Sequence, residues 1–139
     1  MANISNYLEE ALLNHVFRNV EFTRPGATIY IGLFANNKSS DELEANNRGD
    51  EITTYASTLR IGTAFGAPAQ DGGKATITNT DTVEFTVMPA TTVGFIAAFD
   101  NSNYSTGNIL YWAKLTADKP TSTGDTFRMS TGNITFDLD

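Results

Sequence analysis

The start of the chain has the apolar spacing of one amphipathic helix. Within residues 5–18, Leu8, Leu12 and Val16 recur at every fourth position, so they fall on one side of a helix. Pro25 and the glycine that follows it end any helix that has continued so far. The pattern therefore predicts one helix over residues 5–18. Its apolar stripe has to be covered by the protein's own sheet or by another chain, and we expect its own sheet.

The rest of the chain alternates apolar and polar residues, which is the spacing of strands with one buried face. The clearest runs are 27–34, 83–88, 94–99, 109–115, 126–129 and 134–138, and weaker ones are 55–61 and 75–78. Turn sequences rich in Gly, Asp and Asn separate the runs, and no second helical pattern intervenes. We therefore predict a mainly β protein, an antiparallel β-sandwich or barrel of about eight strands preceded by one N-terminal amphipathic α-helix.

The length of 139 residues indicates one domain, 1–139, with the β-sandwich over 27–139. Residues 36–51 form the longest stretch without periodic apolar positions. Loops of this length inside a compact domain are commonly functional or mobile. We expect a long polar loop there, available to a partner.

The composition of the chain excludes or disfavours several classes of function. There is no cysteine, so disulfides, thiolate metal sites and cysteine nucleophiles are excluded. A formal charge of −7 and scattered Lys and Arg residues disfavour a nucleic-acid partner. The sequence shows neither a signal-peptide pattern nor an apolar run long enough to span a bilayer, so we expect no secretion signal and no membrane partner.

A polar loop between two predicted strands resembles a calcium loop only in part. Asp100 and Ser102 stand at alternate positions, but a calcium loop needs a further oxygen donor where Tyr104 stands, a glycine next to it and an acidic residue at its end. The polar residues are explained equally by bonds to their own backbone in a hairpin loop. We expect a structural loop and no bound metal or other cofactor.

Catalytic chemistry has little support. A Ser-His-Asp triad would have to use His15, the single histidine, and no nucleophile-elbow sequence accompanies it. Paired carboxylates are common on solvent-facing strands and loops, so they indicate no particular reaction. We expect a protein that is not an enzyme.

The tripeptide Arg48-Gly49-Asp50 spells an integrin-binding motif inside the long polar loop. Short motifs recur by chance, and a cell-adhesion role would accompany a secreted chain. A turn is the favoured interpretation. The candidate interaction residues are therefore this tripeptide, Tyr104 as the clear aromatic residue of a loop, and Leu8, Leu12 and Val16 of the helix stripe.

The order of several segments resembles a known family. The segments are NISNYLEEALLNHVFRN, TRPGATIYIGLF, FGAP, VEFTVMPATT, FIAAFDNSNYSTGNILYWAKLT, GDTF and GNITFDLD. They resemble a family of small tailed-bacteriophage virion proteins, often labelled tail-fibre-like, which are similar to capsid decoration (cement) proteins in size and architecture. The likeness covers nearly the whole chain and implies no catalytic residues.

The resemblance implies a structural protein of the virion, made in the host cytoplasm. Our first hypothesis is a capsid decoration protein that binds and stabilises the outer head surface. Its expected partners are the major capsid protein and further copies of itself, with which it would form a homotrimer. The alternative is a tail-fibre or baseplate component that contacts tail proteins and binds a host glycan. A carbohydrate-active enzyme is a more distant alternative.

Overall fold

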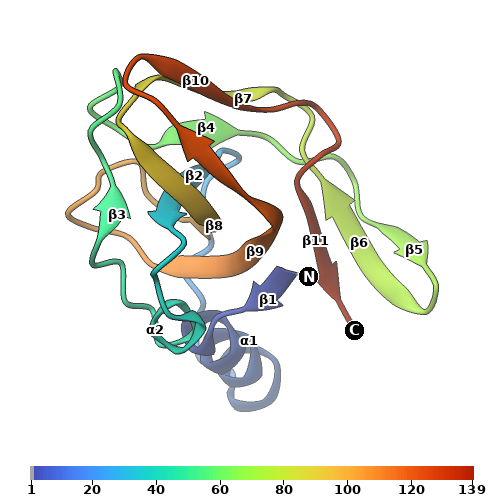
Figure 1. Ribbon diagram of the computed structural model, residues 1–139. Helices are drawn as coiled ribbons and strands as arrows, with labels where there is room; N and C mark the ends of the chain where they lie inside the picture. Colours follow the sequence, from blue (N-terminus) through green and yellow to red (C-terminus); the bar gives the residue numbers. More distant parts are fainter. Residues whose placement is uncertain (1) are drawn as a thin grey trace.

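A computed structural model describes residues 2–139. Its largest sheet is antiparallel and has the strand order β1-β9-β8-β2-β3, with β4 also paired to β2 (Figure 1). The strands of this sheet are β1 (Ala2–Ile4), β2 (Ile29–Ala35), β3 (Glu51–Ile52), β4 (Ile61–Thr63), β8 (Thr91–Phe99) and β9 (Ile109–Thr121).

Two smaller antiparallel sheets complete the β structure. One pairs β7 with β10, and the other has the order β11-β6-β5. Their strands are β5 (Ala69–Asp71), β6 (Lys74–Thr78), β7 (Val83–Met88), β10 (Asp125–Met129) and β11 (Thr135–Leu138). Strand β11 also contacts β1, so the small sheet closes against the edge of the large one. The predicted mainly β, antiparallel fold is confirmed.

Both faces of the large sheet are buried, which explains why β8 is almost continuously apolar. On one face Ile31 and Leu33 pack in a core shared with β7, β10 and β11, including Phe85. On the other face Phe34 packs with Phe99 in a second cluster, beneath α2 (Ser40–Glu44). Neighbouring residues of one strand thus serve two different cores, as the period of two requires.

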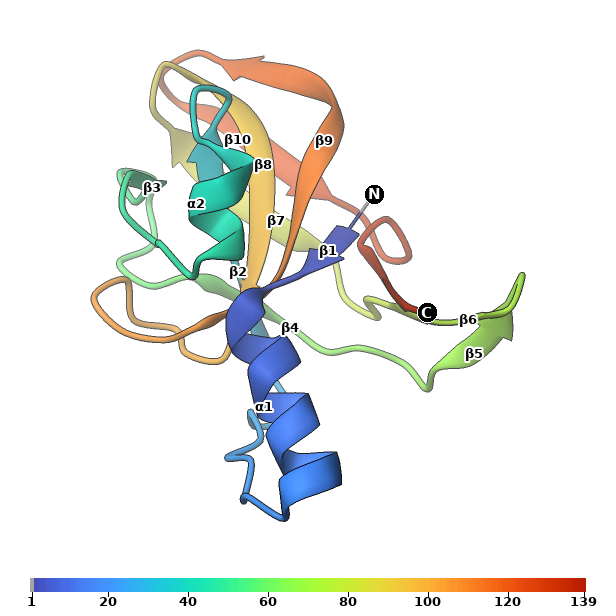
Figure 2. The same cartoon turned by 90° about the horizontal axis from the view of Figure 1, so that it is seen from below.

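The predicted helix is α1 (Asn6–Arg18), and Ser5 caps its start. The Ser5 hydroxyl oxygen accepts the backbone N–H of Leu8 at 3.3 Å and also donates to the backbone carbonyl of Ile109 in β9. Beyond this anchored turn the helix leads away from the sheets (Figure 2). Leu8 is buried, but Val16 is largely exposed. Our expectation that the stripe packs on its own sheet is correct for Leu8 and wrong for Val16.

The segment 36–51 is not a featureless loop, because it contains α2. Ser39 and Glu42 form a capping box at its start, and Leu43 is fully buried in the second cluster. Trp112 of β9 donates its indole N–H to Glu44 at 2.9 Å, which fixes the helix to the sheet.

The weak strand predicted at 55–61 is wrong except at its end. Only Ile61 enters a strand, β4. The Tyr55 ring packs edge-on against Phe85, with 4.9 Å between ring centroids, so its apolar character serves a side-chain contact rather than a strand. The weak strand predicted at 75–78 is present as part of β6.

Replacing Gly94 with alanine is expected to destabilise the fold. A Cβ atom at this position of β8 would lie 2.4 Å from the Cα atom of Asn36, where backbone has to move. Overpacking of this kind costs about 1–3 kcal/mol. Gly26→Ala is the matched control, since nothing lies within 4 Å of its added Cβ. Urea unfolding measures both variants, and equal midpoints for the two would contradict the expected clash.

Candidate functional site

The polar loop between β8 and β9 surrounds a guanidinium group of the chain itself. Nη1 of Arg60 donates to the backbone carbonyl oxygens of Asn101 at 2.9 Å, Asn103 at 2.7 Å and Thr106 at 2.9 Å. The Arg60 residue is only 2% exposed. The loop carbonyls thus bind a cation, and that cation is Arg60.

Glu51 of β3 neutralises the buried guanidinium from the other side. Nε and Nη2 of Arg60 each donate to one carboxylate oxygen of Glu51 at 2.8 Å. The ring of Phe99 lies below, with its centroid 3.5 Å from Cζ of Arg60. A bidentate pair whose remaining N–H groups are also bonded meets the conditions under which a buried ion pair is tolerated.

Burial raises the pKa of Glu51, while the hydrogen bonds and charge of Arg60, and the charge of Arg48, act in the opposite direction. Burial also raises the pKa values of Tyr55 and Tyr104. These shifts follow from desolvation of groups that pack beside the ion pair.

Side-chain bonds fix the shape of the same loop. One carboxylate oxygen of Asp100 accepts the backbone N–H of Asn108 at 2.7 Å. The backbone N–H of Ile109 donates to the side chain of Asn46 at 2.6 Å, which connects the loop to the segment after α2. Gly107 has φ 94°, and an added Cβ there would lie 2.9 Å from the Cβ of Asn101.

Two of the sequence-predicted interaction residues, Arg48 and Tyr104, come together at this loop. The Arg48 guanidinium donates to the carbonyl oxygens of Ser105 at 2.9 Å and Gly107 at 3.2 Å. Gly49 and Asp50 follow on the surface, where the Gly49 carbonyl accepts from a lysine side chain at 2.6 Å. The arginine of the tripeptide is therefore already engaged within the chain.

Tyr104 is half-buried rather than displayed. Its hydroxyl donates to the backbone carbonyl of Ser57 at 3.1 Å, and its ring meets the Tyr55 ring edge-on at 6.1 Å between centroids. Such an aromatic side chain fastens the loop to the body of the protein. It does not offer the open ring face on which a sugar stacks.

Sequence reasoning did not identify Arg60 and Glu51, which organise this site. Arg60 lies between two aliphatic residues in a segment interpreted as a weak strand, and Glu51 ends the segment interpreted as a loop. A charged residue flanked by apolar ones was the only available signal. The pairing itself depends on the sheet, which brings β3 next to the loop.

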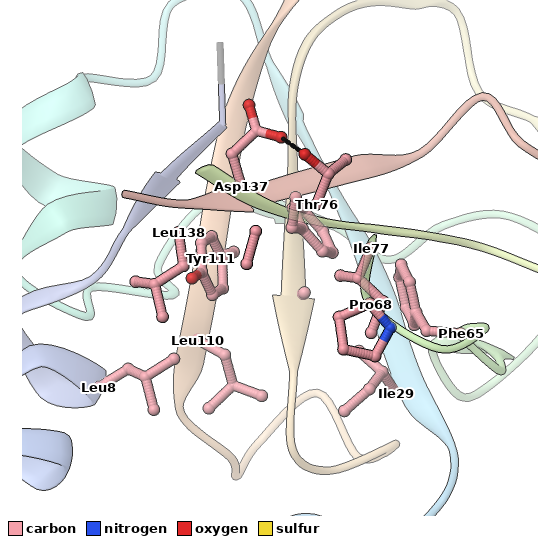
Figure 3. Close-up of a pocket in the computed structure, with 13 residues that line it drawn as sticks. Leu8, Ile29, Phe65, Pro68, Thr76, Ile77, Leu110, Tyr111, Asp137 and Leu138 are labelled. Atoms are coloured by element: carbon pink, nitrogen blue, oxygen red, sulfur yellow. Dashed lines mark hydrogen bonds between the residues drawn. The ribbon is translucent and has the colours of Figure 1, made fainter. Parts of the chain in front are cut away.

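The remaining candidates, Leu8, Leu12 and Val16, lie on α1. The first of them borders an apolar pocket of about 420 Å³ (Figure 3). Leu8 forms part of its wall, Leu12 is half-buried, and Val16 lies farther out on the helix. The other walls come from β6, β8, β9, β11, Ile29 and the segment before β5, and include Phe65, Pro68, Ile77, Leu110, Tyr111, Phe136 and Leu138.

The edge of this pocket is polar but its interior is not. Asp137 accepts the Thr76 hydroxyl at 3.1 Å and the Lys74 ammonium at 2.7 Å, and these bonds lower the pKa of Asp137. The lining offers no other charged side chain. A cavity whose interior is apolar suits apolar side chains.

Side chains that could ligate a metal ion are not clustered within residues 2–139. No set of three His, Asp or Glu side chains there could hold a metal ion. His15 is exposed on α1, with Nδ1 3.3 Å from the carbonyl oxygen of Val20. No helix within the described chain is long and apolar enough to cross a membrane.

A family of known proteins is similar to this chain. A family model described as "Podophage GP4 fiber I protein gp80" matches residues 3–137. The match therefore extends from β1 to β11. It includes the loop between β8 and β9 that surrounds the Arg60 guanidinium, which we call the Arg60 loop, and the pocket beside α1. No curated protein matches the chain significantly.

Replacing Arg60 with methionine is expected to destabilise the protein by about 3–5 kcal/mol, because it leaves a buried carboxylate without its partner. Loop carbonyls would lose their donors at the same time. Equilibrium unfolding in urea measures the change. Arg128→Met is the control, since Arg128 pairs with Glu84 on the surface at 3.3 Å, where such pairs contribute about 0–1 kcal/mol. A loss for Arg60→Met no larger than the control's would contradict the structural role.

Chelation is expected to leave the melting temperature unchanged. The carbonyl oxygens that face into the loop accept hydrogen bonds from Arg60, so the loop does not need a cation from solution. Removal of a tightly bound metal would lower stability by mass action, by about 4 kcal/mol at a thousandfold excess over Kd. Thermal unfolding with and without EDTA makes the comparison. A fall of many degrees with EDTA would show that a metal supports the fold.

Proposed function

The chain belongs to the family of the podophage GP4 fiber I protein gp80, and from that premise we propose that it is a structural subunit of a phage fibre. The observation that carries the proposal is the family match over residues 3–137, nearly the whole chain. We further propose that it acts by binding other virion proteins, including copies of itself, and not by catalysis.

The arrangement of the two candidate surfaces supports binding. The Arg60 loop is closed on itself, because its carbonyl oxygens accept bonds from Arg60 and Arg48. The outer part of α1 instead presents large apolar side chains to solvent, among them Phe17. Exposed apolar surface of this kind marks protein contact sites.

Capsid decoration, our first hypothesis from the sequence, stays as a second candidate because the chain folds as one globular unit. Rod-like proteins are commonly built from stacked repeats that contact only their neighbours. Here all three sheets contribute to one core, since Ile31, Phe85 and Phe136 belong to the same cluster, and no repeat is visible along the chain. A globular unit of this kind also suits a position on a head lattice.

Localisation on the particle is the test. We expect antibody–gold conjugates against this chain to label fibres on virions of the phage that encodes it, seen by electron microscopy, and to leave the faces of the head unlabelled. Label on head faces would overturn the fibre proposal in favour of decoration. Particles lacking the chain provide the negative control for the antibody.

A second measurement separates the same two candidates by energetics. A decoration protein binds the assembled lattice, so it raises the temperature of head disruption in a concentration-dependent way. A fibre subunit leaves that temperature unchanged. Purified protein is titrated onto particles that lack it, and a rise that saturates with concentration would contradict the fibre proposal.

A further inference from the structure

The outer half of α1 carries a broad apolar side that residues 2–139 leave largely uncovered. Leu13 is 60% exposed, Val16 67% and Phe17 76%. At about 100° per residue, these side chains share one half of the helix with Leu12, while Asn14 and Arg18 lie on the other half.

A helix in this position has little to stabilise it. It has 13 residues, and isolated helices shorter than about 12–15 residues are marginal in water. Most helical stability in proteins comes from packing of the apolar side, and here packing is limited to the turn that contains Leu8. The outer turns therefore need a surface supplied from outside the chain.

The pocket beside α1 has the size and chemistry of such a surface. Its walls are apolar, and its volume is about 420 Å³. Since a cavity of about 150 Å³ holds one benzene ring, this pocket has room for two or three large side chains. Leu8 belongs both to the helix stripe and to the pocket wall, so the two surfaces are continuous (Figure 3).

The charges at the two surfaces are complementary. At the pocket edge, the Lys74 ammonium is influenced by the carboxylates of Asp71, Asp137 and Asp139, so negative charge is in excess there. The outer end of α1 carries the positively charged Arg18 in its last turn. A basic helix end approaching an acidic rim is favoured electrostatically.

We propose that the outer half of α1, with Leu13, Val16 and Phe17, docks into the apolar pocket of a second copy of this chain. The helix leads away from the body that holds its own pocket, so the docked helix comes from a neighbour (Figure 2). Helix to pocket is a contact between different patches, which generates a closed ring or a chain of subunits. This inference goes beyond the proposed function, because it holds on a fibre and on a head alike.

Sedimentation equilibrium of the purified chain tests the contact without any phage particle, so its outcome is independent of the localisation experiment. The wild-type chain is expected to associate in the micromolar range. Phe17→Asp is expected to weaken association at least about thirtyfold, the effect of losing an interface hot spot. Asn14→Asp adds the same charge on the other half of the same helix, away from the apolar side chains, and is expected to weaken association far less than Phe17→Asp does.

A pocket variant separates helix-to-pocket docking from helix-to-helix packing. Leu138, which lines the pocket and is 50% exposed, is changed to aspartate. Leu138→Asp alone is expected to be monomeric, and a mixture with Phe17→Asp is expected to form a heterodimer, because one intact helix then meets one intact pocket. Circular dichroism of the two variants, each expected to melt as a folded β protein, checks that neither has lost its fold.

Several results would overturn the proposal. They are a wild-type chain that stays monomeric at tens of micromolar, Phe17→Asp that associates normally, or Leu138→Asp that associates as the wild type does. A monomeric wild type that binds a fluorescent apolar probe in the pocket would equally overturn it, and would assign the pocket to a small apolar ligand.

Discussion

A buried positive charge determines how one end of this molecule is built. The guanidinium of Arg60 has to be neutralised and hydrogen-bonded once it leaves water, because an uncompensated buried charge costs several kcal/mol. Glu51 supplies the opposite charge, and the loop after β8 supplies carbonyl oxygens. Strand β3, the loop and the segment before β4 are therefore held in one arrangement by a single side chain.

The polar composition of that end follows from the same requirement. Asn and Asp side chains accept backbone N–H groups of the same loop and keep the loop carbonyls turned toward Arg60. Arg48 and Asn46 then fasten the segment that contains α2 to the outside of the loop. No buried side-chain nitrogen or oxygen among the described residues is left without a partner.

Local patterns in the sequence predicted the elements that depend on local spacing. The alternation in β7, β9 and β11 was sufficient for the fold class, and the spacing of Leu8, Leu12 and Val16 was sufficient for α1. The short helix α2 was missed because five residues cannot show a helical period, although its capping box is present in the sequence. The Arg60–Glu51 pair was missed for another reason. It joins β3 to a segment that the sequence marked as a strand, and only the three-dimensional register shows that the two carboxylate oxygens face the guanidinium.

The contrast between the two ends of the molecule bears on how it assembles. The Arg60 end is rigid because every segment there is fixed by several bonds, whereas α1 is fixed only through its first turn. If the outer turns of α1 become fully ordered only in a neighbour's pocket, part of the interaction energy is used to order the helix, and affinity falls accordingly. Pockets of the wrong shape are bound weakly, because a poor fit does not offset the free-energy cost of ordering the helix. An assembly subunit benefits from this, since it has to stay apart from unrelated apolar surfaces and join only a partner whose pocket fits Phe17.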